Sequence, residues 1–175
     1  MPSGQTHDRI TLWSLPVIAG CTYLLTHGDS DRTLIVAGAF LFSGLMFGPD
    51  LDIYSVQYKR WGYLRWLWIP YQKAIKHRSF LSHGLIIGTT VRLLYLAAWL
   101  SILGIFVVGI AELWGDVSWN WLLWVESAKK YTYEWLALFI GLEMGAISHI
   151  LSDRIGSFSK RRQRNKLSSN KIKHK

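Results

Sequence analysis

Four long apolar stretches alternate with shorter polar segments along the chain. They cover about residues 12–25, 34–47, 85–114 and 135–151. Each is too long for an ordinary strand and no hairpin signals interrupt them, so we expect a helix in every case. The first two are nearer 15 than 20 residues, so they would cross a bilayer only if flanking side chains snorkelled or the helices packed partly within protein. The pattern predicts an all-α membrane protein with about four transmembrane helices.

Two of the polar links add structural detail. The tight link Gly28–Asp31 predicts that the first two helices form an antiparallel hairpin. Residues 54–76 mix five Lys and Arg residues with Trp and Tyr, and Pro70 breaks the segment. Such a mixture is typical of an interfacial amphipathic helix on an anionic leaflet, although an ordinary surface helix has the same pattern.

The composition favours a membrane protein. Half of the 175 residues are hydrophobic, and many of the ten Trp and eight Tyr flank the apolar stretches, as they do at membrane interfaces. A soluble core rich in aromatic side chains is the alternative. The single cysteine, Cys21, excludes an internal disulfide and lies in an apolar run, so we expect it to be a small core residue.

The net charge of +9 is unevenly spread. Basic side chains concentrate in the 54–76 segment and in residues 160–175, which hold eight Lys or Arg and no acid. The positive-inside rule places both regions in the cytoplasm, and with four spans the N-terminus lies there too. We therefore expect an inner (plasma) or thylakoid membrane protein that contacts membrane lipids and has both termini in the cytoplasm.

The same pattern divides the chain into two parts. Residues 1–158 should form one helical membrane domain, and residues 159–175 a disordered basic tail, because the tail is polar and lacks apolar periodicity. A basic tail could bind nucleic acid, but nothing in the body of the chain resembles a nucleic-acid module, so we do not expect nucleic acid as a partner.

Four short polar clusters lie at the ends of the apolar stretches, and counting spans brings all four to the cytoplasmic side. Together they hold seven side chains that suit a divalent metal: His7, Asp50, Asp52, His77, His83, His149 and Asp153. Any one pair has an ordinary explanation, such as a solvated turn or a helix-surface hydrogen bond. Seven ligands at one face exceed the needs of a single zinc ion, so we expect one or two ions, with Zn or Mn favoured.

The spacing within the clusters indicates how the ligands would be presented. His149 and Asp153 are four residues apart and share one helix face. Asp50 and Asp52 follow Pro49, and in extended backbone two such carboxylates can flank one cation or bridge two.

His77 and His83 are six positions apart, so they would not share a helix face. His77 should lie in a loop, with Ser79 as a candidate N-cap and His83 in the first turn of the third helix.

Three side chains are candidates for catalysis. Asp52 or Asp153 could orient an attacking water, and Arg78 could hold a substrate phosphate, although Arg78 serves equally well as a positive-inside charge. Glu143 lies inside the last apolar stretch and is itself a candidate functional acid. A structural ion pair between Glu143 and Arg92 is the favoured alternative.

These clusters resemble a family of small bacterial proteins, closest in character to its cyanobacterial members, that is described as metal-binding. The resemblance covers about residues 3–156 and is carried by four segments: 3–8, 47–52, 77–83 and 148–153. The pattern also resembles a broader group of inner-membrane metal-dependent hydrolases. More distantly, the ligand types are similar to those of zinc-dependent phospholipase C and related nucleases. The resemblance implies metal binding by these residues and supplies no substrate.

Two functions follow as hypotheses. One is a membrane-embedded metal-dependent hydrolase that acts on a phosphoester, such as a lipid; the other is a non-catalytic metal-binding or scaffold protein of the same membrane. The surplus of ligands favours catalysis, whereas the absence of an obvious base besides the ligands disfavours it.

Overall fold

The computed structural model describes residues 4–115 and 120–173, and every regular element within these residues is a helix. The α-helices are α1 (Gly4–Leu25), α2 (Ser30–Leu45), α3 (Val56–Arg60), α4 (Ile69–Ala74), α5 (Phe80–His83), α6 (Ile87–Trp114), α7 (Trp121–Lys130) and α8 (Thr132–Lys173). Two 3₁₀ helices, η1 (Pro49–Asp52) and η2 (Gly62–Trp68), lie between them. The predicted all-α class is confirmed.

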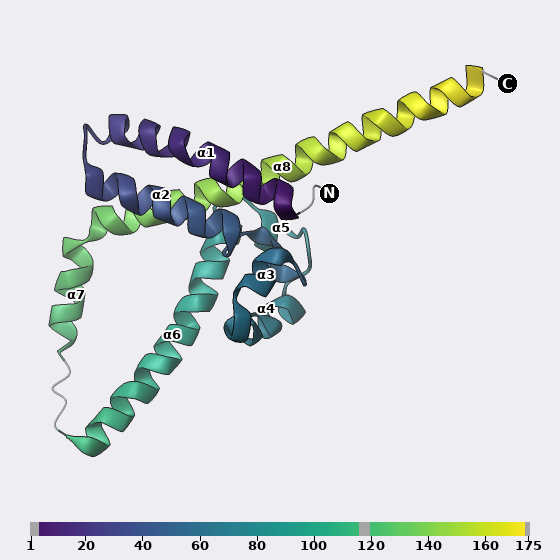
Figure 1. Cartoon of the computed structure of the whole chain (residues 1–175). Helices are drawn as coiled ribbons and strands as arrows, with labels where there is room; N and C mark the ends of the chain where they lie inside the picture. Colours follow the sequence, from purple (N-terminus) through teal and green to yellow (C-terminus); the bar gives the residue numbers. More distant parts are fainter. Residues whose placement is uncertain (1–3, 116–119, 174–175) are drawn as a thin grey trace.

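α1 and α2 form the predicted hairpin, which Figure 1 shows lying against α8. The turn is built from His27 and Gly28, both with positive φ (54° and 88°), a conformation that glycine adopts at little cost. Asp29 then caps α2 by accepting a hydrogen bond of 3.0 Å from the Arg32 N–H. Because the turn closes one end of the hairpin, the first residues of α1 lie beside the last residues of α2.

The contact between α2 and α8 is close because α8 presents small residues to it. A Cβ atom at Gly141 would lie 2.4 Å from the Val36 carbonyl oxygen, and one at Gly145 would lie 2.7 Å from that of Phe40. Ser43 on α2 donates a 2.6 Å hydrogen bond to the Leu142 carbonyl. A Gly-x-x-x-Gly pair of this kind lets two helix backbones approach. The packing places the C-terminal ends of α2 and of the apolar part of α8 on the same side.

Residues 54–76 fold into three short helices, α3, η2 and α4, instead of the single interfacial helix that the sequence predicts. Trp68 and Tyr71 on their inner face are buried with Phe47 and Leu51, and the rings of Phe47 and Trp68 pack edge to face at 5.6 Å. Pro70 stands in the first turn of α4, where its missing N–H costs no helical hydrogen bond. This aromatic core packs against η1 through Leu51.

α6 diverges from the other long helices, and α7 links its far end to α8 (Figure 1). Within α6 only Gly88, Thr89 and Arg92, near its start, are buried. Among the residues that the structure describes, three segments are long and apolar enough to cross a membrane: Ser30–Asp52, Ile87–Trp114 and Thr132–Phe158. α1, which holds the first predicted span, is not among them, so the expected number of four is not confirmed.

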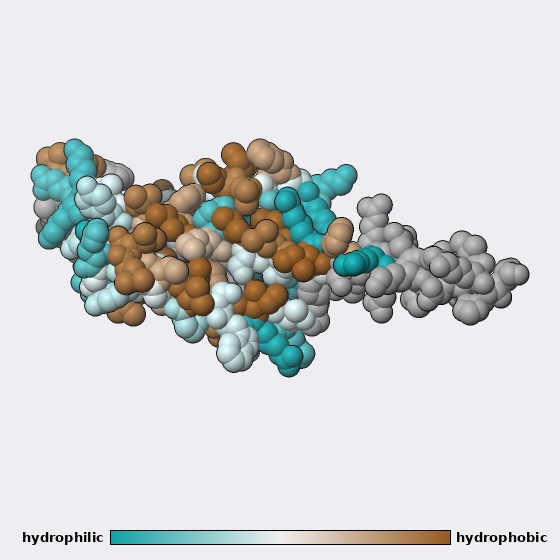
Figure 2. All heavy atoms as spheres, turned by 90° about the horizontal axis from the view of Figure 1, so that it is seen from above, coloured by the Kyte–Doolittle hydropathy of each residue, from teal (hydrophilic) through white to brown (hydrophobic). Residues whose placement is uncertain are grey.

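Apolar side chains are widely exposed on the surface. Figure 2, seen from above, shows hydrophobic side chains gathered over the middle of the coloured part of the molecule, with hydrophilic ones among them and at its left end. The exposed residues of α1 include Trp13, Leu24 and Leu25. Large exposed apolar areas commonly mark surfaces that contact a partner or a membrane.

The structure differs from two of the expectations. Cys21 is exposed and not part of the core, because the buried residues of α1, His7 and Thr11, lie near its N-terminal end and leave its later turns open. α8 continues as a helix to Lys173, across most of the segment predicted as a disordered tail. Residues 157–173 contain neither Gly nor Pro, and seven of them are Lys or Arg, which are good helix formers.

Candidate metal centre

Five separate pieces of the chain meet where the helix ends converge, and they carry all seven predicted ligands. His7 comes from the first turns of α1, and Asp50 and Asp52 come from η1, which follows α2. His77 lies in the loop after α4, and His83 ends the short helix α5. His149 and Asp153 lie one turn apart on α8. The residues are up to 146 positions apart in the sequence, so only the packing of the helices brings them together.

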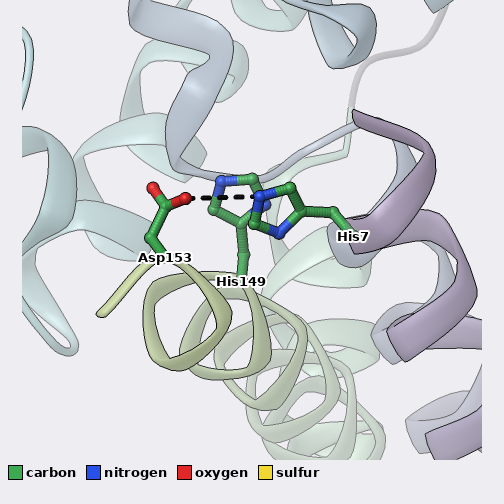
Figure 3. A group of neighbouring side chains, drawn as sticks. All are labelled: His7, His149 and Asp153. Atoms are coloured by element: carbon green, nitrogen blue, oxygen red, sulfur yellow. Dashed lines mark ion pairs between the residues drawn. The ribbon is translucent and has the colours of Figure 1, made fainter. Parts of the chain in front are cut away.

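The first ligand group consists of His7, His149 and Asp153, all of them buried. Figure 3 shows His7 reaching from α1 toward the two side chains of α8. The His7 and His149 rings stack with their centroids 4.0 Å apart, and Nε2 of His7 lies 3.3 Å from Oδ1 of Asp153. One ligand atom from each residue falls within 4.8 Å of the others, which is close enough for a single ion.

The second ligand group consists of Asp50, His77 and His83, and Asp50 connects it to the first. Oδ1 of Asp50 lies 3.8 Å from Nε2 of His83, while Oδ2 lies 3.3 Å from Nε2 of His149. The two oxygens of one carboxylate therefore face different ligand groups. A bridging carboxylate of this kind is how proteins hold two ions a short distance apart.

Asp52 lies behind the second ligand group and is not a member of either group. Its Oδ1 is 2.8 Å from Nδ1 of His77, and its Oδ2 accepts a 2.5 Å hydrogen bond from the Ser82 hydroxyl. The Ser82 oxygen is in turn 2.5 Å from Nδ1 of His83. Since the single Ser82 proton goes to Asp52, Nδ1 of His83 must be the donor to Ser82.

These contacts set the tautomers of two histidines. Asp52 holds the proton of His77 on Nδ1 directly, and through Ser82 it holds that of His83 on Nδ1 as well. Both rings are left with a free Nε2 lone pair, the form that binds a metal ion. Ser82 was not predicted as a functional residue; its place directly before His83 was the only signal in the sequence.

Several buried polar atoms of both ligand groups have no hydrogen-bond partner, although burial normally demands one. They are Nδ1 of His7, Oδ1 of Asp50, Nε2 of His83, both ring nitrogens of His149 and both carboxylate oxygens of Asp153. Each buried donor or acceptor that stays unpaired would cost about 1–3 kcal/mol of stability. A bound cation would satisfy them together, so the residues present fit a metal.

Two of the histidines are held in the neutral form. Burial lowers the pKa of His7, and the neighbouring His149 lowers it further, against the opposing effect of Asp153. Burial likewise lowers the pKa of His83, against the opposing effects of Asp52 and Asp50. A neutral imidazole is required of a metal ligand, so the environment prepares both side chains for coordination.

Arg92 and Glu143 both hydrogen-bond to the backbone on either side of His83, at Ser82 and Ile86. Arg92 donates 3.0 Å hydrogen bonds to the Ser82 carbonyl and to the Thr89 hydroxyl, while Glu143 accepts a 2.8 Å bond from the Ile86 N–H. The two side chains form no ion pair with each other, so the favoured pairing was wrong. The backbone of the linking segment, which has unpaired polar groups of its own, is the better partner for each.

A surface ion pair anchors the start of α1. Arg60 on α3 makes two hydrogen bonds to the Asp8 carboxylate, at 2.8 and 2.5 Å, and a third of 2.9 Å to the Leu45 carbonyl. The Asp8 contact raises the pKa of Arg60, so the guanidinium stays charged. Because Asp8 follows His7, this contact ties His7 to the end of α2.

Arg78 lies beside the ligand groups and not within them. Its side chain is exposed, and its backbone takes a positive φ of 60°, which is uncommon for a residue other than glycine. Together with His83 and Asp153 it lines a hollow of about 490 Å³. A smaller hollow of about 270 Å³ reaches His7, Asp50 and His149 from the side of α3. The ligand groups can thus be reached from outside.

The fold and the centre define an all-helical protein with two joined His/Asp groups able to hold divalent metal ions. Residues 2–163 match the family described as uncharacterized metal-binding protein, and the chain belongs to that family. This match spans nearly the whole chain, and it supports the metal binding that the resemblance implied.

Two further comparisons are less informative. An uncharacterized protein of Aquifex aeolicus (strain VF5) is 36% identical over 58 residues, a match that covers 33% of this chain and 40% of that protein. The chain therefore aligns with less than half the length of this relative. No solved structure matches the chain.

Proposed function

We propose that the protein binds two divalent metal ions, zinc or manganese, and uses them to hydrolyse a phosphoester. The observation that carries this proposal is the Asp50 carboxylate, whose two oxygens face two ligand groups with unpartnered buried atoms. A lone structural ion would need only four ligands, whereas two ions held about 3.5–4 Å apart suit phosphoryl chemistry.

Different side chains would have different roles in this reaction. Bound ions would act as Lewis acids toward the substrate phosphate and lower the pKa of a coordinated water. Asp153 has both oxygens free of hydrogen bonds and is placed to orient the water or take its proton. The water oxygen adds to phosphorus, the ester P–O bond breaks, and the alcohol leaves with a proton. Arg78 would hold the phosphate, as a guanidinium does well.

Asp52 is the weaker candidate for the water-orienting role that the sequence predicted. Both of its oxygens already accept hydrogen bonds, one from His77 and one from Ser82, and its side chain is fully buried. Its better role is to orient His77 and His83, because a carboxylate hydrogen-bonded to a ligating imidazole commonly fixes the orientation of that ring.

A non-catalytic metal-binding or scaffold role is the second candidate. Burial favours it, since His7, His149 and Asp153 are only 4–8% exposed, as is common for the ligands of a structural ion. Both candidates share the same ligands, so metal binding alone does not separate them.

We further propose that the protein lies in a membrane with the metal centre at the cytoplasmic face. Three segments long and apolar enough to cross a bilayer support this, as does the continuous apolar surface of α6. The contact between His7 and Asp153 supports the expectation that the two chain ends lie on the same side.

The function is tested on detergent-purified protein by metal analysis and by hydrolysis of phosphomonoesters, phosphodiesters and phospholipids. We expect up to two equivalents of metal and a hydrolytic activity that chelation abolishes and added metal restores. His149→Ala should lose about one equivalent of metal together with the activity, whereas His27→Asn, at the far end of the hairpin, should lose neither. Metal-replete protein that is inactive on every substrate would reject the hydrolase and leave the binding role.

A further inference from the structure

A hollow of about 490 Å³ opens beside the metal centre where the apolar part of α8 ends. One wall consists of His83 and Asp153, one side chain from each ligand group. Arg78 and Arg154 line it as well, and Ile150 and Phe158 add apolar surface. Its volume is in the range of pockets that hold small molecules. We refer to it below as the arginine hollow.

The charges of the arginine hollow are suited to an anion. Arg78 comes from the loop before α5 and Arg154 from α8, so two unrelated segments bring a guanidinium to the same space. Neither side chain forms an ion pair within the described parts of the chain. Two guanidinium groups beside a centre for divalent metal ions would bind a doubly charged phosphate better than a neutral ligand. Each guanidinium can make paired hydrogen bonds to the phosphate oxygens.

The apolar wall indicates what else the ligand carries. Phe158 is 70% exposed although it is large and hydrophobic, and Ile150 lies two turns before it on the same helix. Phe158 also lies just before the run of basic residues that begins at Lys160, where the apolar part of α8 gives way to charge. In a membrane, the hollow would therefore lie where lipid phosphates meet the acyl chains.

We infer that the arginine hollow binds the phosphate of an amphiphile, a phosphomonoester carried on an apolar chain. Arg78 and Arg154 hold the phosphate against the metal centre, and Phe158 contacts the first part of the chain. The inference rests on the proposed function, whose substrate class it names. It assigns to Arg154 and Phe158 roles that the sequence did not suggest.

The test measures binding of two phosphonates to zinc-loaded protein in nanodiscs of phosphatidylcholine, by isothermal titration. Hexylphosphonate carries the charge and an apolar chain, methylphosphonate carries the charge alone, and neither can be hydrolysed. Arg78→Gln and Arg154→Gln should each weaken both ligands by about tenfold or more, as expected for a lost charged hydrogen bond. Phe158→Ser should weaken hexylphosphonate only. Arg162→Gln, which removes a charge two turns further along α8, is the matched control and should change neither.

The outcomes separate this inference from the proposed function. Equal affinity for the two phosphonates in wild type, or unchanged affinity in both arginine variants that retain zinc, would overturn it. Tight hexylphosphonate binding by a protein that hydrolyses nothing would keep the inference and reject the hydrolase. Nanodiscs that also contain phosphatidic acid identify the source: competition with hexylphosphonate assigns the ligand to the bilayer, and its absence assigns it to soluble phosphoesters.

Discussion

At the scale of single residues, the centre depends on the different tasks of two neighbouring carboxylates. Asp50 presents its oxygens to ligand atoms of both groups, while Asp52 turns away and holds the rings of the second group. The sequence gives them the same apparent role, since both follow Pro49 in one turn. The 3₁₀ geometry of η1 decides between them, because it points the two side chains in different directions.

Asp50→Ala should remove more metal than the loss of any ligand that serves one group. We expect His77→Ala to lower the bound metal by about one equivalent and Asp50→Ala to lower it toward zero, because the bridging carboxylate contributes to both ions. The measurement is metal content after dialysis, with His27→Asn as the control. Equal losses in the two variants would contradict a bridge.

Asp52→Asn should weaken metal binding without changing how many ions bind at saturation. Loss of a carboxylate that orients ligating imidazoles typically costs about 10–100-fold in metal affinity, and the amide cannot accept hydrogen bonds from both His77 and Ser82 in the same way. Competition with a metal indicator measures the affinity, and Asp31→Asn at the far end of the hairpin is the matched control. A fall in stoichiometry at saturating metal would instead make Asp52 a direct ligand, as the sequence predicted.

At the scale of elements, two helix contacts set the distances between ligands. α2 and α8 approach closely through Gly141 and Gly145, which fixes η1 against His149. The pair Asp8–Arg60 fixes the start of α1. A metal centre built from five pieces is only as precise as the packing that supports it.

Gly145→Val should destabilise the protein and weaken metal binding together. A Cβ there would lie 2.6 Å from the Ser43 Cβ and 2.7 Å from the Phe40 carbonyl oxygen, so α2 and α8 must move apart. Overpacking of this kind costs about 1–3 kcal/mol in the free energy of unfolding. Thermal unfolding in detergent measures it. Gly104→Ala on α6, where a Cβ meets no atom within 4 Å, is the control and should leave metal binding unchanged.

At the scale of the whole molecule, the centre couples stability to pH. The pKa values of His7 and His83 are lowered, mainly by burial, from an ordinary value of 6.5. Below pH 6.5 the unfolded chain therefore binds more protons than the folded one. The stability that the neutral rings confer is complete above pH 6.5 and is lost as the pH falls toward their folded pKa values.

The metal-free protein should thus have a Tm that falls as the pH is lowered through 6.5. Differential scanning calorimetry of chelated protein measures this trend, and the dependence should be weaker in His83→Gln. Metal binding should weaken over the same range, because protons compete for the same nitrogens. A Tm that rises on acidification would contradict the neutral, buried state of these rings.

The exposed apolar surface leads to a prediction about membrane association. The protein should stay in the membrane fraction after alkaline carbonate extraction, since α6 has few protein partners and would otherwise expose its apolar side chains to water. The basic C-terminal segment should resist protease added outside spheroplasts, as the positive-inside rule requires. Complete extraction by carbonate or high salt would reject an integral membrane protein.

Much of the element pattern could be predicted from the sequence alone, and six of the seven candidate ligands are the side chains that the structure brings into the two ligand groups. Apolar periodicity is a local property, so it predicted helices and the hairpin at Gly28, and the residue types of the four polar clusters indicated a metal. The same local reasoning misjudged Cys21, which lies in an apolar run but is exposed, because the cover over α1 depends on where the other helices lie.

Tertiary structure decided how those ligands are grouped and oriented. It sorted them into two groups joined by Asp50, turned Asp52 into a support for His77 and His83 through Ser82, and gave Arg92 and Glu143 separate backbone partners. None of this follows from spacing along the chain, because each contact joins residues that only helix packing brings within a few ångströms. Residue type determined which chemistry the protein can perform, and the close approach of α2 to α8 and of α1 to both determined which atoms meet.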